Sequence, residues 1–202
     1  MLIGFLGRAR SGKDTCIEAL VREFGGQRAG FADQVKVLVQ RMFDLPDDPF
    51  EGDKGKATRY HWQHMPENGG RAGVVTVREL LQWFGTDICR RIDPLIWIRA
   101  FTRIWGKTMQ HVYVADVRFQ NEVNYILGNG GFVIKLLRAD ADTPAEVAAH
   151  ESESGIDSIV PSFAAQERFL TFDNRTMSLA EQDAAIVKFV RERIAVIEGV
   201  WP

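Results

Sequence analysis

Apolar residues along this chain follow two alternating patterns. Short runs rich in apolar residues, which are typical of buried strands, occur at residues 1–6, 111–115, 132–137 and 169–172, and a further short strand is predicted at 27–31. Between these runs, apolar residues recur every three to four positions and predict helices over about residues 14–24, 34–43, 77–88, 94–105, 119–127, 144–154 and 179–197. Strands that alternate with helices predict a five-stranded parallel sheet covered on both faces, a three-layer α/β/α fold.

Three of the predicted helices, including one that starts at Thr143 with Glu146, begin with a capping pattern, in which a hydroxyl and a carboxylate three residues apart bond each other's backbone N–H groups. Thr76 with Glu79 predicts a second start, and Ser178 with Glu181 predicts a third. In the helix predicted near residues 34–43, the positions expected to face inward are Val35, Leu38, Val39, Met42 and Phe43.

Residues 45–73 show neither pattern and hold three of the seven prolines. A stretch of this length is uncommon as a plain connection, so we expect a functional flap over about residues 45–75. The length of 202 residues fits one domain with a sizeable core and such an insertion. We therefore predict a single domain over residues 1–202.

The first predicted strand leads directly into a loop bracketed by glycines, with the sequence Gly7-Arg8-Ala9-Arg10-Ser11-Gly12-Lys13. This spacing between a strand and a helix predicts a phosphate-binding loop, because the backbone N–H groups surround a polyphosphate and the lysine contacts its outer phosphates. The start of the next helix adds unpaired N–H groups and a dipole that favours an anion. Arg8 and Arg10 make the loop basic and are expected to share in phosphate binding.

The residue after the lysine departs from the usual pattern, in which Ser or Thr follows directly. Here Asp14 intervenes, and Thr15 supplies the hydroxyl one residue later. A carboxylate beside a polyphosphate repels it unless a cation lies between them, so Asp14 predicts either a metal-bound water or an arginine partner. The alternative is that Asp14 only stabilises the helix start by its charge. The lysine-x-threonine spacing is similar to that of small nucleotide kinases such as adenylate kinase.

The overall charge is nearly balanced, with 25 Lys and Arg against 27 Asp and Glu. This balance argues against stable binding of nucleic acid, which usually requires a basic excess. Cys16 and Cys89 are the only cysteines, and both fall in predicted helices, as expected of buried thiols in a reducing cytosol. No apolar run reaches membrane-spanning length, and the first is too short for a signal peptide. We expect a cytoplasmic protein with no membrane partner.

Charged residues gather near the ends of the predicted strands, where parallel sheets bind their ligands. Asp116 ends an apolar strand, where phosphate-loop proteins hold Mg²⁺; the alternative is a solvated or helix-capping aspartate. Arg118 and Glu122 lie four residues apart at a helix start, so their side chains are expected to meet. They would form either a surface ion pair or a clamp for phosphate and substrate.

Another polar pair, Arg78 and Gln82, shares one face of the helix predicted at residues 77–88. A guanidinium binds phosphate with two parallel hydrogen bonds, and a carboxamide offers a donor and an acceptor to a base edge. The alternative is a solvated helix face. His61 and His64 have a spacing seen in metal sites, but no cysteine lies near them, so we interpret them as flap residues and not zinc ligands.

Five segments match one family in order along the chain: GRARSGKDT at 7–15, FADQVK at 31–36, RELLQWFGTD at 78–87, DVRFQNE at 116–122 and HESE at 150–153. With Asn174 after the last strand, they make the chain similar to the bacteriophage deoxynucleoside monophosphate kinases. The resemblance implies an adenylate-kinase-like P-loop fold, ATP as phosphoryl donor, Mg²⁺ as cofactor and a deoxynucleoside monophosphate as acceptor. It also implies a lid-like segment over about residues 138–156 and, for a phage protein, the host cytoplasm as location.

The resemblance also implies roles for individual residues. Those that would bind ATP are Arg10, Ser11, Gly12, Lys13, Asp14, Thr15 and Asn174. Those that would bind the acceptor are Lys36, Arg78, Gln82, Trp97, Arg118, Glu122 and Glu151. Catalysis would fall to Lys13, Asp116 and Arg138, with Arg138 near the transferring phosphoryl group, and Mg²⁺ would be bound by Thr15 and Asp116.

This reading needs no general base, because the acceptor phosphate, with a second pKa of about 6, is largely dianionic at neutral pH. Catalysis then consists of alignment and charge stabilisation. One alternative is a kinase for another small acceptor, such as dephospho-coenzyme A or a sugar, which would need Asp33 or Asp116 as a base. A second is a nucleic-acid-dependent ATPase or end-processing protein. The accepted bases and the oligomeric state, including a homodimer, are open.

Overall fold

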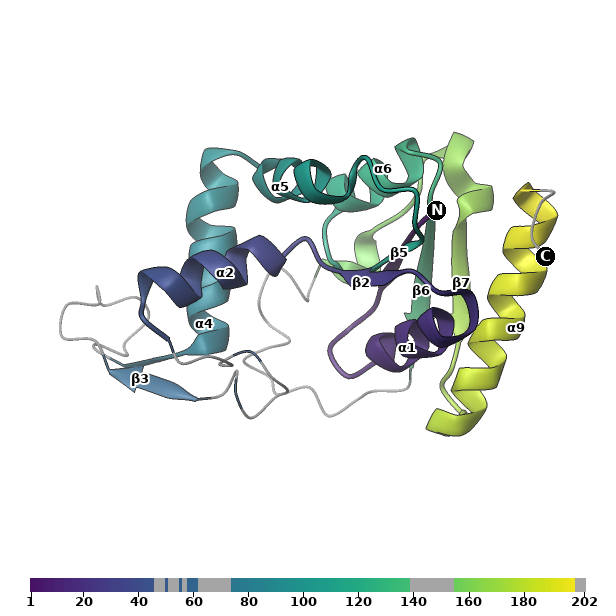
Figure 1. The fold of residues 1–202 in the computed structure, drawn as a ribbon, viewed down its shortest axis with the longest axis horizontal. Helices are drawn as coiled ribbons and strands as arrows, with labels where there is room; N and C mark the ends of the chain where they lie inside the picture. Colours follow the sequence, from purple (N-terminus) through teal and green to yellow (C-terminus); the bar gives the residue numbers. More distant parts are fainter. Residues whose placement is uncertain (46–49, 51–54, 56–57, 62–73, 139–154, 199–202) are drawn as a thin grey trace. The chain divides into compact units, whose positions relative to one another are not determined.

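The computed structural model describes residues 1–45, 50, 55, 58–61, 74–138 and 155–198 (Figure 1). The chain divides into two compact units. The first comprises Met1–Gly30 and Thr102–Pro202, and the second comprises Phe31–Phe101. The prediction of one domain over residues 1–202 stays a prediction.

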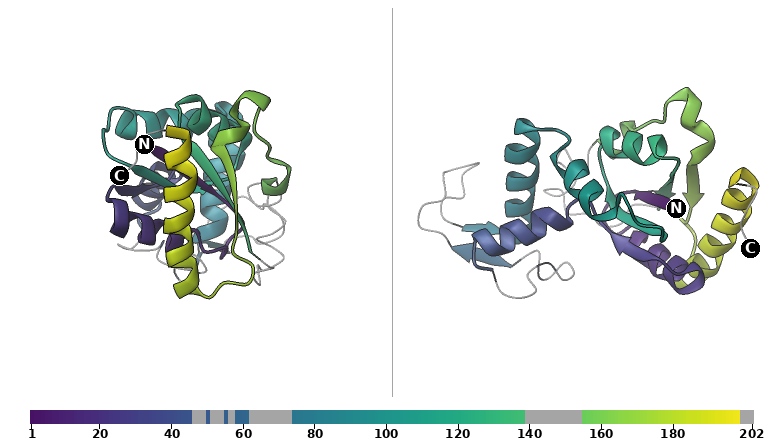
Figure 2. Two further views of the ribbon diagram at one scale, coloured as in Figure 1. Left: turned by 90° about the vertical axis from the view of Figure 1, so that its right-hand side faces the viewer. Right: turned by 45° about the horizontal axis from the view of Figure 1, so that its top comes forward.

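The first unit is built on a five-stranded parallel sheet, as the sequence predicted. Its strands are β1 (Leu2–Leu6), β2 (Gln27–Ala29), β5 (Val112–Val117), β6 (Phe132–Leu137) and β7 (Phe169–Asp173), in the order β2-β5-β1-β6-β7. Its helices are α1 (Lys13–Phe24), α6 (Gln120–Gly128), the short 3₁₀ helices η2 (Ile156–Ser158) and η3 (Phe163–Arg168), and α9 (Leu179–Glu198). Figure 2 shows α9 running along the sheet.

Alternate residues of β1 show that helices cover both faces of this sheet. Ile3 and Phe5 are fully buried in a core shared with α1 and α9, which includes Ile17 and Ile186. Gly4 points the other way, where a Cβ atom would meet the side chain of Ile126 on α6 at 2.4 Å. Glycine is therefore required for α6 to approach the sheet, and the three-layer α/β/α prediction is confirmed.

The second unit contains α2 (Asp33–Met42), α4 (Val77–Gln82), the π-helix η1 (Trp83–Arg90) and the first part of α5 (Ile96–Trp105). It also contains an antiparallel pair, β3 (Arg59–His61) with β4 (Val74–Thr76). The rings of Phe31 and Phe101 pack at 4.8 Å between centroids. Neither strand of the pair was predicted, because each has only three residues within a stretch without periodicity.

Local chemistry accounts for the helix starts. Thr76 and Glu79 form the predicted capping box at α4, with the Thr76 hydroxyl accepting from the Glu79 N–H at 3.1 Å. At α9, the Glu181 carboxylate accepts from the Ser178 N–H at 2.8 Å, and the Ser178 hydroxyl accepts in return from the Glu181 N–H.

Within the part of the chain that the structure describes, no helix combines the length and apolar character needed to cross a membrane.

For the second unit, one expectation was wrong and another is met with a change of helix geometry. Leu38 and Met42 were expected to face inward on α2, but their exposed fractions are 42% and 62%, and the buried positions are Val35 and Val39. The buried face of α2 is thus one residue wide at each turn. The helix predicted over 77–88 also changes to π geometry at Trp83, which alters the spacing of faces beyond that point.

The two predicted mobile elements fall mainly outside the described residues. Within the flap at 45–75, the structure describes Leu45, Phe50, Gly55 and the segments around β3 and β4. Within the lid-like segment at 138–156 it describes Arg138, Gly155 and Ile156, so the helix predicted near 144–154 lies outside the described residues.

Candidate phosphate-binding site

The loop between β1 and α1 has the backbone conformation that the motif predicts. Gly12 precedes the first residue of α1 with a φ of 89°, in the left-handed region that favours glycine. Arg10 also has a positive φ, of 62°, and the Ser11 N–H donates to the Arg8 carbonyl at 3.2 Å. The loop therefore turns tightly and leads into the N-terminus of a 12-residue helix, where the unpaired N–H groups and the helix dipole favour an anion.

The Lys13 side chain forms hydrogen bonds with this loop. Its ammonium donates to the carbonyls of Gly7 at 2.7 Å and Arg8 at 2.6 Å, and to the Ser11 hydroxyl at 3.3 Å. Lys13 is thus held at the mouth of the loop and places a positive charge there. This is the position that the motif predicts for it.

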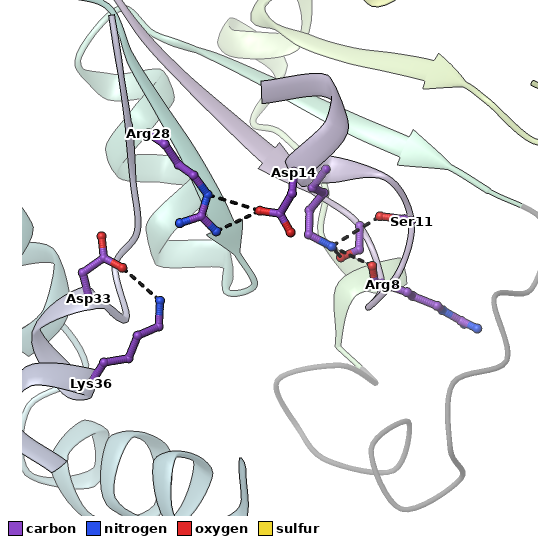
Figure 3. Close-up of polar contacts among 8 residues, drawn as sticks. Arg8, Ser11, Asp14, Arg28, Asp33 and Lys36 are labelled. Atoms are coloured by element: carbon purple, nitrogen blue, oxygen red, sulfur yellow. Dashed lines mark hydrogen bonds and ion pairs between the residues drawn. The ribbon is translucent and has the colours of Figure 1, made fainter. Parts of the chain in front are cut away.

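Asp14, the residue that departs from the usual motif, has an arginine partner. Arg28 on β2 donates to one Asp14 carboxylate oxygen from Nε at 3.2 Å and from Nη2 at 2.8 Å (Figure 3). Both side chains are about half exposed or more, so the pair contributes about 1 kcal/mol or less to stability. The positive charge of the Arg28 guanidinium offsets the Asp14 carboxylate, which would otherwise repel a phosphate. An arginine partner was one of the alternatives that the sequence left open for Asp14, but no signal in the sequence identified Arg28.

Three predicted site residues lie at the same edge of the sheet as the loop. Parallel pairing sets Leu6, the last residue of β1, opposite Val117 of β5 and Lys135 of β6. Asp116 is thus the penultimate residue of its strand, half-buried, and not the residue after it. Arg138 and Asn174 directly follow β6 and β7, whose last residues also pair.

Below the loop lie two fully buried carboxamides. Asn174 donates from Nδ2 to the Ser11 carbonyl at 2.9 Å and to Gln182 Oε1 at 2.8 Å. Gln182, in the first turn of α9, donates from Nε2 to the Gly12 carbonyl at 2.8 Å. Sequence reasoning missed Gln182, because a glutamine just after a capping box is typical of an ordinary exposed helix surface.

Gln182 also connects the loop to two neighbours. Its Nε2 lies 3.1 Å from the Cys16 sulfur, and its Oε1 accepts from Arg138 Nη1 at 3.2 Å. Burial raises the pKa of the Cys16 thiol to about 12, although Cys16 lies near a helix N-terminus, which would lower it. Cys16 is therefore a neutral packing residue here, as the sequence predicted of a buried thiol.

Glu122, at the start of α6, is 3% exposed. Its carboxylate accepts from the backbone N–H groups of Arg118 at 2.8 Å and Phe119 at 3.1 Å, so it caps the helix. The sequence predicted that the Arg118 and Glu122 side chains meet. The structure shows Glu122 bonded to the Arg118 backbone, and its role toward an acceptor stays a prediction.

The remaining predicted acceptor residues lie in the second unit. Arg78 and Gln82 stand one turn apart on α4, both partly exposed, and Lys36 on α2 forms an ion pair with Asp33 at 3.0 Å (Figure 3). Trp97 is 4% exposed, and its indole N–H donates to the Gly85 carbonyl at 2.9 Å. Glu151 lies outside the described residues. Among the described residues, no three His, Cys, Asp or Glu side chains cluster as a metal site.

The chain is similar to deoxynucleotide monophosphate kinases in sequence. Residues 70–162 match the family described as deoxynucleotide monophosphate kinase. A protein of Acanthamoeba polyphaga mimivirus named "Putative deoxynucleotide monophosphate kinase" is 32% identical over 171 residues, which cover 76% of this chain and 84% of that protein. The uncharacterized protein ORF77 of Ictalurid herpesvirus 1 (strain Auburn) is 24% identical over 160 residues, 77% of this chain and 58% of that protein.

A solved structure supports the fold. Shikimate kinase from Aquifex aeolicus superposes with a TM-score of 0.50 at 12% sequence identity, over 96% of this chain and 98% of that chain. At this identity the likeness concerns architecture alone. It agrees with the P-loop arrangement of sheet, loop and helix described above.

Proposed function

Because this chain belongs to the deoxynucleotide monophosphate kinase family and is a phosphotransferase, we propose that it transfers the γ-phosphoryl group of ATP to a deoxynucleoside monophosphate, giving the diphosphate and ADP. The observation that carries the proposal is the loop at Gly7–Thr15, where the Lys13 ammonium and the N-terminus of α1 offer positive charge on one surface. The family assignment supplies the acceptor class.

The donor side of the reaction follows from the loop. Backbone N–H groups at the start of α1 bind the β- and γ-phosphates of ATP, and Lys13 exchanges its loop carbonyls for phosphate oxygens. Arg10 adds charge from the loop rim. Arg138, whose Nη1 bonds Gln182, stabilises the charge that develops on the transferring phosphoryl group.

The residues present fit a magnesium ion that arrives with ATP. Mg²⁺ prefers oxygen ligands and is usually held by one or two carboxylates or hydroxyls together with phosphates and water. Thr15, on the first turn of α1, and Asp116, near the end of the neighbouring strand β5, offer such oxygens. When bound, the ion would neutralise charge on the phosphates. Thr15 and Asp116 would orient it.

On the acceptor side, Lys36, Arg78, Gln82 and Trp97 of the second unit are proposed to bind the monophosphate, together with Arg118, Glu122 and Glu151. The acceptor phosphate group is already largely dianionic at neutral pH, so no side chain is assigned as a base. The enzyme's task is to align the two phosphates and exclude water. We also propose that the protein acts in the cytoplasm of an infected host; the support for this is the viral source of the two relatives, which concerns the host and not the compartment.

The direct test incubates the protein with ATP and Mg²⁺ and, separately, with each common deoxynucleoside and ribonucleoside monophosphate. We expect diphosphate and ADP in equal amounts from at least one deoxynucleoside monophosphate. Absence of diphosphate from every monophosphate would reject the proposal. ATP hydrolysis that requires added DNA would favour the nucleic-acid-dependent alternative, and phosphorylation of a sugar or dephospho-coenzyme A would favour the other.

Arg78→Ala is expected to raise the KM for the acceptor by about 10- to 100-fold, since a bidentate charged hydrogen bond contributes roughly 1.5–3 kcal/mol. The KM for ATP should change less than threefold, because Arg78 is assigned to the acceptor alone. Steady-state kinetics with each substrate varied in turn measures both constants. An unchanged acceptor KM would remove Arg78 from the site.

A further inference from the structure

The underside of the phosphate-binding loop is held by two side chains that touch consecutive peptide groups. Asn174 Nδ2 donates to the Ser11 carbonyl at 2.9 Å, and Gln182 Nε2 donates to the Gly12 carbonyl at 2.8 Å. Both side chains have no exposed surface, so neither exchanges these bonds with water. Two carboxamides from separate elements, the segment after β7 and the first turn of α9, therefore fix adjacent peptide planes of one loop.

Because each of these peptide bonds is trans, a hydrogen bond to its carbonyl also fixes the direction of the N–H group on the opposite side of the same peptide plane. In a planar trans peptide, the C=O and N–H groups point in opposite directions. Holding the Ser11 carbonyl therefore aims the Gly12 N–H away from Asn174, and holding the Gly12 carbonyl aims the Lys13 N–H away from Gln182. These two N–H groups lie at the start of α1, where such groups bind anions.

Gln182 uses the whole hydrogen-bonding capacity of its carboxamide. Nε2 donates to the Gly12 carbonyl and lies within hydrogen-bond distance of the Cys16 sulfur, while Oε1 accepts from Asn174 and Arg138. Reversing the amide would place Oε1 against the Gly12 carbonyl oxygen, so this orientation is the one that the neighbours require. A carboxylate at this position cannot donate, and an apolar side chain can neither donate nor accept.

We propose that Gln182 and Asn174 are positioning residues, which aim the N–H groups of Gly12 and Lys13 at the phosphates of the nucleotide. The proposal rests on the proposed function for the identity of that nucleotide as ATP. Neither side chain contacts the nucleotide; both act through the peptide groups that they hold. Gln182 Oε1 also accepts from Arg138 Nη1, so the same side chain fixes the position of the Arg138 guanidinium relative to the loop.

The test measures binding of two ligands to three variants, Gln182→Met, Gln182→Glu and Asn174→Leu. Calorimetric titration with ADP and Mg²⁺ gives the affinity for a nucleotide, and competition by inorganic tripolyphosphate gives the affinity for phosphates without a nucleoside. We expect each variant to bind both ligands with an affinity tenfold lower or more. The factor should be the same for ADP and tripolyphosphate, because misdirected N–H groups affect only the binding of the phosphates. Affinities within twofold of wild type in a folded variant would overturn the proposal.

The two ligands also separate this role from a direct contact with the nucleoside. If Asn174→Leu weakened ADP while leaving tripolyphosphate unchanged, Asn174 would contact the base or sugar, and its positioning role would be refuted. Ile186→Val, one turn further along α9 in the core, is the control for lost stability. Ile186→Val should lower the melting temperature and leave both affinities unchanged. If Ile186→Val lost as much affinity as the Gln182 variants, Gln182 would contribute only to stability and its positioning role would be refuted.

The measurement also stands apart from the proposed function. Binding of ADP and tripolyphosphate requires no acceptor, so the variants can be compared even if the wild-type protein forms no deoxynucleoside diphosphate. Failure of the transfer assay would reject the proposed reaction alone. Equal binding by wild type and variants would reject the positioning role alone.

Discussion

Replacing Lys13 by alanine is expected to lower kcat for phosphoryl transfer by about 10²–10³-fold or more, the usual effect of removing one preorganised charge from a transition state. Lys13 provides the ammonium at the mouth of the loop, held by the Gly7 and Arg8 carbonyls. No other described lysine lies on the loop itself. Steady-state kinetics with saturating ATP and acceptor measures the change.

The fold should survive the Lys13→Ala substitution, because the hydrogen bonds of Lys13 go to partly exposed loop atoms and not to the core. Circular dichroism and thermal melting would check this. Lys188→Ala is the matched control: Lys188 is 74% exposed on α9 and makes one long ion pair with Glu192 at 3.7 Å. Full activity in Lys13→Ala, or an equal loss in Lys188→Ala, would contradict the role assigned to the loop lysine.

The sequence predicted those parts of the fold that depend on neighbouring residues. The capping boxes at Thr76 and Ser178 involve residues three apart, and most strands of the main sheet are short runs rich in apolar residues, so both signals are local. The phosphate-binding loop was equally predictable, because its glycine and lysine spacing is itself the functional feature. The order of strands then brought Asp116, Arg138 and Asn174 to the same sheet edge, as the general rule for parallel sheets requires.

The missed features depend on contacts between distant residues. Arg28 and Asp14 are 14 positions apart, and Gln182 is 170 positions from Gly12. Neither Arg28 nor Gln182 has a local pattern that distinguishes it from a surface side chain. The π-helix at Trp83–Arg90 contains Gly85, which packs against Val35, 50 positions earlier, so closely that a Cβ atom would come within 3.2 Å of its side chain. Periodicity reports which face is apolar, and it does not report which neighbour that face will meet.

Gly12→Ala is expected to damage both the loop and the activity, for two separable reasons. The φ of 89° at Gly12 is strained for any residue with a Cβ atom, at a cost of roughly 1–3 kcal/mol. The new Cβ would also lie 2.6 Å from Gln182 Nε2 and 2.7 Å from Oε1, and would disrupt a buried amide whose lost hydrogen bonds cost about 1–3 kcal/mol. Together these predict a melting temperature lower by roughly 5–15 °C and a loss of kcat/KM for ATP of about 100-fold or more.

Two other glycines separate these causes. Gly25 also has a positive φ, of 69°, but a Cβ there would meet nothing within 4 Å, so Gly25→Ala should show the backbone strain alone and keep its ATP affinity. Gly128, near the end of α6, has neither a positive φ nor a close neighbour, so Gly128→Ala should be neutral or stabilising by up to about 1 kcal/mol. Calorimetric melting and ATP titration of the three variants would give the comparison. We expect Gly12→Ala to lose more stability and more ATP affinity than Gly25→Ala. Equal losses in the two variants would show that the close contact between Gly12 and the Gln182 amide does not hold the phosphate-binding loop in its active shape.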